Sequence, residues 1–211
     1  MRDPSRPAAP LKGRLDPVSR PYPNMLTDER INMLARVASS PHAAKTDGAQ
    51  DRSILTLAAA SYGSRPEDES TIPTGFDPLA AVLFECIVEG AYIVATADGV
   101  FDDEERRAFE RIVTAATGGA VSQKHIADLI SDLSDQLAED GLDLRLQRLG
   151  EGVVRREHAQ EVIRIAALIA QCSEDVSEVE RSVLERLATA CKLETSEVDM
   201  ALADVTKALH A

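Results

Sequence analysis

The sequence predicts an all-α protein: a helical bundle with two pseudo-symmetric helix-turn-helix repeats, plus an extended Pro-rich N-terminal tail. From residue 76 onward apolar residues recur at helical spacing, and no segment shows the sustained alternation of a half-buried strand. Aromatic residues are scarce, with four Phe, three Tyr and no Trp. Small aliphatic side chains must therefore form most of the core, which favours helix packing over a β-sandwich or barrel.

A repeat relates two parts of the helical region. Residues 91–116, AYIVATADGVFDDEERRAFERIVTAA, align at a constant shift of 75 positions with residues 166–191, AALIAQCSEDVSEVERSVLERLATAC. Eight of the 26 aligned positions are identical, and Glu105 pairs with Glu180 in this alignment. Each copy reads as a helix, a turn and a second helix, so we expect two hairpins that pack against each other and close one core.

The chain divides into three regions. Residues 1–24 carry a net charge of +3 and contain six of the ten prolines, so they are predicted to be a tail without regular helix, either disordered or docked on a partner. Residues 25–75 are a linker with two short helical segments, at 26–40 and 51–63, and the sequence leaves open whether these pack on the domain. Residues 76–211 form the main helical domain, with helices predicted at 78–97, 102–116, 122–139, 142–149, 154–172, 177–191 and 196–209.

Composition narrows the classes of partner and compartment. The net charge of −13 would repel a phosphate backbone, so no nucleic-acid partner is expected. Three cysteines without a C-x-x-C spacing, and the absence of a signal-peptide pattern, predict a reduced, cytoplasmic protein. The apolar run at 78–97 contains Glu85 and Glu89, which favours a buried central helix over a transmembrane span and leaves peripheral membrane association open.

No pattern in the sequence points to catalysis. The phosphate-binding, dinucleotide-binding and serine-hydrolase motifs are absent, and the four histidines are isolated from each other and from the cysteines. This spacing argues against a zinc site. We therefore expect a protein that is not an enzyme.

The stretch ADGVFDDEE, residues 97–105, is the strongest candidate site, and it has two interpretations. Asp102-x-x-Glu105 has the form of a capping box at a helix N-terminus, and Ser177-x-x-Glu180 is its counterpart in the second repeat. Capping leaves Asp98 and its acidic neighbours without a role, and a hard divalent cation takes several such oxygens. An EF-hand is excluded, because placing Gly99 at the sixth loop position puts Val94 where the first Asp is required. Capping is the main interpretation, with weak cation binding open beside it.

The same residues resemble a known family. An apolar helix that ends in Ala-Asp-Gly, followed by an apolar residue, two polar residues and a Glu that opens the next helix, is similar to the signature of the TerB family, to which a domain of the DjlA co-chaperones is related. ATADGVFDDEERRAFERI, residues 95–112, carries the first copy of this signature, and residues 170–202 are similar to the second. The resemblance covers about residues 78–209.

The resemblance implies an all-α bundle with a non-enzymatic role in bacterial stress response of the tellurite-resistance type. It also implies metal association through acids at Asp98, Asp102 and Glu105 in the first copy, with calcium or magnesium as the candidate ions. In the second copy the Asp-Gly is replaced by Ser173-Glu174, so Asp175 and Glu180 are the weaker candidates.

The sequence thus predicts a TerB-like protein that works by binding another protein, a divalent cation or both. An alternative is an accessory subunit or adaptor that docks on a larger assembly through its tail, residues 1–24, because a cationic Pro-rich segment can lie extended across another protein's surface. The sequence does not predict an oligomeric state.

Overall fold

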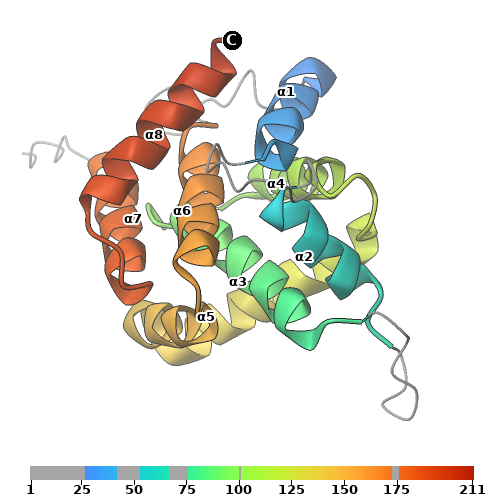
Figure 1. The fold of residues 1–211 in the computed structure, drawn as a ribbon, viewed down its shortest axis with the longest axis horizontal. Coiled ribbons are helices and arrows are strands. Elements are labelled where there is room, and N and C mark those ends of the chain that lie inside the picture. Colours follow the sequence, from blue (N-terminus) through green and yellow to red (C-terminus); the bar gives the residue numbers. More distant parts are fainter. Residues whose placement is uncertain (1–26, 42–52, 67–75, 100, 173–175) are drawn as a thin grey trace, which may run out of the picture.

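A computed structural model describes residues 27–41, 53–66, 76–99, 101–172 and 176–211, and every regular element among them is an α-helix. The all-α prediction is therefore confirmed, whereas the Pro-rich tail lies outside the described residues. The eight helices are α1 (Asp28–Ser39), α2 (Ile54–Gly63), α3 (Pro78–Ala95), α4 (Asp103–Ala116), α5 (Gln123–Gly152), α6 (Arg156–Ala170), α7 (Glu178–Ala190) and α8 (Ser196–Leu209) (Figure 1).

Helix α3 forms the centre of the bundle, with α2, α5, α6 and α7 packed around it (Figure 1). Most of its side chains between Ala81 and Val94 are buried, as expected for a helix that is apolar on nearly all sides. Among the described helices, α3 is the one that is long and apolar enough to cross a membrane, and 67% of that stretch is buried in the protein. Its buried Glu89 accepts a hydrogen bond of 2.7 Å from Arg145 of α5, so this acid is paired inside the bundle.

The two predicted hairpins are α3–α4 and α6–α7, and their end contacts repeat. At the end of the first helix, the amide of Thr96 donates to the carbonyl of Tyr92, as Gln171 does to Ala167 75 positions later. In the second helix of each copy a threonine hydroxyl donates to the carbonyl four residues earlier, from Thr114 at 2.7 Å and from Thr189 at 2.9 Å. The internal repeat is therefore a repeat of local hydrogen bonding as well as of sequence.

Helices α1 and α2, whose packing the sequence left open, lie on the bundle. Ile31, Leu34 and Val37 of α1 are buried, and they belong to the same apolar core as the helices of the repeats. An ion pair on α6 fixes both helices: the guanidinium of Arg164 donates to carbonyls at the end of α1, and the carboxylate of Glu161 accepts the Leu55 amide in the first turn of α2.

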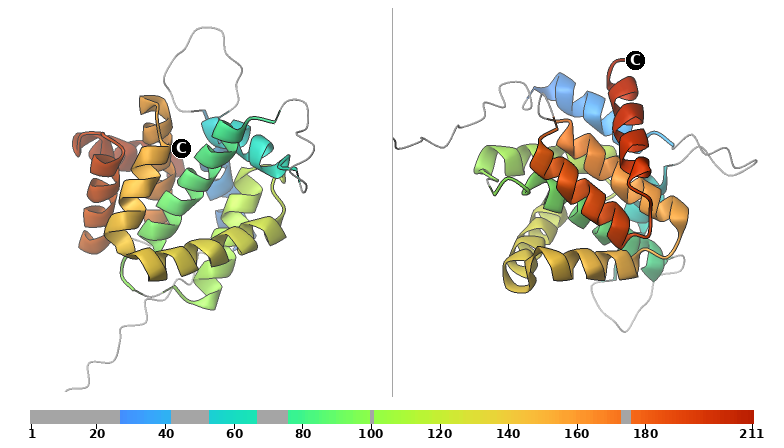
Figure 2. Two further views of the ribbon diagram at one scale, coloured as in Figure 1. Left: turned by 90° about the horizontal axis from the view of Figure 1, so that it is seen from below. Right: turned by 90° about the vertical axis from the view of Figure 1, so that its left-hand side faces the viewer.

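Helix α5 consists of two straight parts that meet at Gly141, as the left view of Figure 2 shows. Gly141 has φ 76° and ψ 163°, a conformation outside the helical region that glycine adopts without steric cost. This confirms the predicted division of the segment into two helices at this residue.

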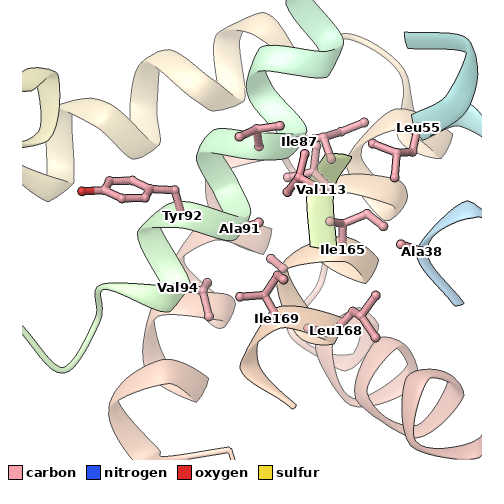
Figure 3. Packing of buried hydrophobic residues seen from close by; sticks show 14 of the residues in the cluster. Ala38, Leu55, Ile87, Ala91, Tyr92, Val94, Val113, Ile165, Leu168 and Ile169 are labelled. Atoms are coloured by element: carbon pink, nitrogen blue, oxygen red, sulfur yellow. The ribbon is translucent and has the colours of Figure 1, made fainter. Parts of the chain in front are cut away.

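The middle of the core is closed and apolar. Side chains from α1, α2, α3, α4 and α6 converge there, among them Ala38, Leu55 and Ile165 (Figure 3). The space left between them is about 10 Å³, at the lower limit of what one water molecule needs. This part of the core therefore has no room for a ligand larger than a water molecule.

Candidate functional site

The turn between α3 and α4, which we call the first corner (residues 96–105), is where the sequence placed its candidate site. Helix α3 ends at Ala95, and the chain reverses through Gly99, whose φ of 82° lies in the region that favours glycine. The Gly99 amide donates to the carbonyl of Thr96 at 3.0 Å and closes the turn. Asp98 is exposed at this turn, next to the start of α4.

Asp102 and Glu105 form the predicted capping box. The Asp102 Oδ1 atom accepts the amides of Glu104 at 2.8 Å and Glu105 at 2.9 Å, and the Glu105 Oε2 atom accepts the amide of Asp102 at 2.9 Å. These bonds satisfy three amides that the first turn of a helix otherwise leaves unpaired. The capping interpretation is therefore confirmed for both residues.

The second corner, between α6 and α7, also has a capping box. The Ser177 hydroxyl accepts the amide of Glu180 at 3.2 Å, and the Glu180 carboxylate accepts the amide of Ser177 at 2.7 Å. Glu180 is buried, so its carboxylate belongs to the packing of α7. Asp175, the other candidate in this copy, lies outside the described residues.

The described residues do not bring a ready-made metal site together. Within the described ranges, no group of three or more His, Cys, Asp or Glu side chains has a geometry that could hold a metal ion. Asp102 and Glu105 each direct a carboxylate oxygen to amides of their own helix. The cation site at Asp98, Asp102 and Glu105 therefore stays a prediction, and a bound ion would have to share oxygens with the capping box.

The structure reveals a hollow beside the first corner that the sequence did not predict. This corner hollow has a volume of about 410 Å³, which lies within the range of small ligand pockets. It lies between the end of α3, the first turn of α4 and the first part of α5, and its lining residues are Tyr92, Thr96, Gly99, Phe101, Asp103, Arg106, Ile130, Ser134 and Leu137. Sequence reasoning missed it because residues 92–106 and 130–137 meet only in the folded bundle.

A second, shallower groove lies between α5 and α7. It has a volume of about 670 Å³ and is lined by acids, bases and small residues of both helices, including Asp143, Glu185 and Arg186. The helices approach closely at its floor, because a Cβ atom at Gly150 would lie 2.1 Å from the carbonyl oxygen of Ala190. Its mixed charges do not select one class of ligand.

The buried titratable groups are poor nucleophiles. Burial raises the pKa of Cys86 and of Cys172 to about 12 and that of Cys191 to about 11. These thiols are therefore protonated at neutral pH, whereas a reactive cysteine needs a lowered pKa. Burial, together with the nearby Arg155, lowers the pKa of His158.

These features define the chain as an all-helical, two-hairpin bundle whose open sites lie at its surface. A model of one protein family, described as Tellurite resistance protein TerB, matches residues 87–203, which is more than half of the 211 residues. The chain belongs to the TerB family, as the corner motifs predicted. The match runs from within α3 to α8, so α1 and α2 lie outside it. Neither the curated proteins nor the solved structures give a match to this chain.

Proposed function

We propose that this TerB-family chain is a non-catalytic, cytoplasmic protein that acts by binding a partner protein, in a stress response of the tellurite-resistance type. Membership of the TerB family supports a role in this stress response. The surface of α5 supports action by binding a partner protein, and it is the observation that carries the proposal.

The first part of α5 carries an acidic stripe, which we define as Asp128, Asp132, Asp135 and Glu139. All four are exposed, and their spacing of four, three and four residues places them on one side of the helix. Lys124 pairs with Asp128 at 2.6 Å, but within the described ranges no ion pair reaches the other three acids. A stripe of one charge sign steers and orients a partner of the opposite sign, so we expect a partner with a basic surface.

Neutralising the stripe tests this proposal. The assay is chemical cross-linking in the host cells, followed by recovery of the full-length chain with whatever protein is attached to it. We expect the native chain to recover a partner protein, and the triple variant Asp132→Asn, Asp135→Asn, Glu139→Gln to recover none. The matched control neutralises three exposed acids elsewhere: Glu178→Gln, Glu194→Gln, Asp204→Asn. Equal loss in both variants would show a general effect of net charge, and equal recovery in all three chains would reject the stripe as the binding surface.

Divalent-cation binding at the first corner is a second part of the proposal, supported by the acids that flank the capping box. Calorimetric titration of calcium, magnesium, manganese and zinc into the native chain and into Asp98→Asn tests it. This substitution leaves the capping residues Asp102 and Glu105 in place, so a loss of heat reports on the ion and not on the helix end. The absence of heat with every ion, or unchanged heat in the variant, would reject the site.

The tail supports an alternative, in which the chain is an adaptor docked on a larger assembly. Residues 1–24 carry +3, whereas residues 25–75 carry −2 and residues 76–211 carry −14. Such a cationic segment can bind an acidic assembly. On this alternative, replacing the five basic residues of the tail by glutamine should abolish co-purification with the assembly, and the α5 variant should retain it.

A further inference from the structure

Helix α5 bends at Gly141, and the residues around this bend contribute little to the core. Before the bend the helix is anchored by the buried Leu133, and after it by the buried Leu146. Between these two residues, a stretch that the structure describes throughout, no residue is buried. This stretch, residues 134–145, is a bent bridge between two anchored parts of one helix, and we call it the elbow (Figure 2).

A buried ion pair ties the elbow to the central helix α3. The side chains of Glu89 on α3 and Arg145 in the elbow are only 8% and 11% exposed. The Glu89 Oε1 atom accepts a hydrogen bond of 2.7 Å from the Arg145 Nε atom, and the Nη2 atom lies 2.7 Å from the same oxygen. Salt screens a pair with so little exposure only weakly, so this contact holds the elbow against α3.

The same arginine also braces the bend. Asp140 comes directly before Gly141, and its Oδ2 atom accepts hydrogen bonds from two arginines that come after the bend, Arg145 at 3.2 Å and Arg148 at 2.6 Å. Gly141 has a positive φ of 76°, and a residue at a hinge is one that can absorb a large change in φ and ψ. The carboxylates of Glu89 and Asp140, joined by Arg145, therefore fix a backbone angle that glycine leaves free to change. We call these three residues the latch.

The other contacts of the elbow are weaker. Leu137 and Leu142 pack against the core, but both are only partly buried. Asp143 pairs with Arg186 of α7 at the surface, where ion pairs contribute little to stability. The latch is therefore the main tie between the elbow and the rest of the bundle.

The elbow also forms part of the wall of the corner hollow. Ser134 and Leu137 line this hollow of about 410 Å³ together with Tyr92 and Thr96 at the end of α3. Glu89 lies three residues before Tyr92, so the latch is within one turn of the hollow on the same helix. An outward movement of the elbow would widen the hollow, because it would carry one wall away from α3.

We propose that the elbow of α5 is a movable wall of the corner hollow, and that Glu89, Arg145 and Asp140 are the latch that holds it closed. Breaking the latch lets the elbow move about Gly141 between its two anchored ends and opens the hollow to larger molecules. The inference rests neither on the acidic stripe nor on the cation site, so it holds or fails independently of the proposed function.

Amide hydrogen exchange in the full-length chain tests the latch. The variant Glu89→Met, Arg145→Met removes both buried charges together, so neither stays unpaired, and Asp140 keeps Arg148. We expect exchange in residues 134–145 to become at least about tenfold faster, with native rates in the anchored residues 126–133 and 146–150, because exchange reports local opening. The matched control is Glu161→Leu, Arg164→Met, which removes the buried ion pair of α6 and should leave exchange in the elbow unchanged.

A thiol at the opposite side of the hollow reports whether the hollow opens. Thr96→Cys places one at the fixed end of α3, and its reaction with an aromatic disulfide reagent should be at least about tenfold faster when the latch is removed. The three native cysteines are buried, and the latch variant without Thr96→Cys gives their background rate. Circular dichroism checks that each variant is folded. If the latch variant does not fold, Glu89→Gln, which removes one charge and keeps the shape, should give an increase of about threefold in both measurements.

Three results would overturn the proposal. Unchanged exchange in the elbow would show that the packing of Leu137 and Leu142 holds it without the latch. An equal increase of exchange in all helices would show that the ion pair serves the stability of the whole bundle. Faster exchange in the elbow with an unchanged reaction of the thiol from Thr96→Cys would show that the elbow moves without widening the hollow.

Discussion

Replacing Arg164 by methionine should strongly destabilise the protein and release α1 and α2 first. The Arg164 side chain is 7% exposed and its partner Glu161 is 1% exposed. Its guanidinium forms two bonds to the Glu161 carboxylate, at 2.8 and 2.9 Å, and two to the carbonyls of Val37 at 2.9 Å and Ala38 at 2.7 Å. Methionine preserves much of the apolar stem and removes all four donors.

The size of the effect follows from what the substitution leaves behind. The Glu161 carboxylate stays buried without its cation, and breaking a buried ion pair by removing one partner costs about 3–5 kcal/mol. The carbonyls at the end of α1 also lose a partner, which adds to the loss without being strictly additive. Against a typical domain stability of about 5–15 kcal/mol, we expect at least 3 kcal/mol, roughly a third of the total.

Urea unfolding followed by circular dichroism measures this loss, and amide hydrogen exchange locates it in α1 and α2. The control is Arg186→Met, because Arg186 pairs with Asp143 at the surface, where such pairs contribute about 1 kcal/mol or less. The double variant Glu161→Leu, Arg164→Met should be no less stable than Arg164→Met alone, since it removes the unpaired charge. A loss below about 1 kcal/mol for Arg164→Met, or a double variant clearly worse than the single one, would refute the reasoning.

Three further substitutions test other parts of the structure. Ser177→Ala removes the cap on the Glu180 amide and should cost about 1 kcal/mol in the free energy of unfolding, measured in urea. Gly150→Ala places a Cβ 2.1 Å from the Ala190 carbonyl oxygen, so α5 and α7 must separate; the melting temperature should fall by several degrees, which corresponds to about 1–3 kcal/mol. His158→Gln should flatten the pH dependence of stability below about pH 6.5. Because burial lowers the pKa of folded His158, the unfolded chain binds more protons there, and the native protein loses stability relative to the variant as the pH falls through this window.

Each of these predictions has a contrary outcome. An unchanged Ser177→Ala protein would mean that the second corner is held by packing and not by its cap. Gly150→Ala should be worse than Gly152→Ala, whose added Cβ would meet side-chain atoms alone, the Cys86 sulfur at 3.0 Å and Val82 Cγ1 at 3.9 Å. The reverse order would contradict the close helix contact. Parallel stability profiles for the native chain and His158→Gln from pH 8 to pH 5 would contradict the lowered pKa.

The sequence predicted those parts of the fold that depend on neighbours along the chain. The capping boxes at Asp102 and Ser177 could be predicted, because the capping residue and the acid that bonds back to it are three residues apart in any helix. The end of one helix at Gly141 and the start of the next could be predicted, because glycine adopts a positive φ locally, without tertiary contacts. The repeat could be recognised for the same reason, since equivalent residues make equivalent local contacts within each hairpin.

The candidate site was only partly predictable. The first corner and its acids were found, but the corner hollow was not, because Tyr92 reads in the sequence as one more apolar position of α3. Its place in the lining of the hollow becomes visible only when Ser134 of α5 is brought to the same hollow, and no periodic pattern links residues 42 positions apart.

The sequence by itself determined the helices, their ends to within three residues, and the two-hairpin repeat, because turn geometry, capping and apolar periodicity act over a few residues. Only the tertiary structure decided that α1 and α2 belong to the bundle, that Arg164 holds them, and that a hollow forms beside the first corner. These features depend on side chains far apart in sequence. Their pairing is set by how the helices pack in three dimensions, which spacing along the chain does not record.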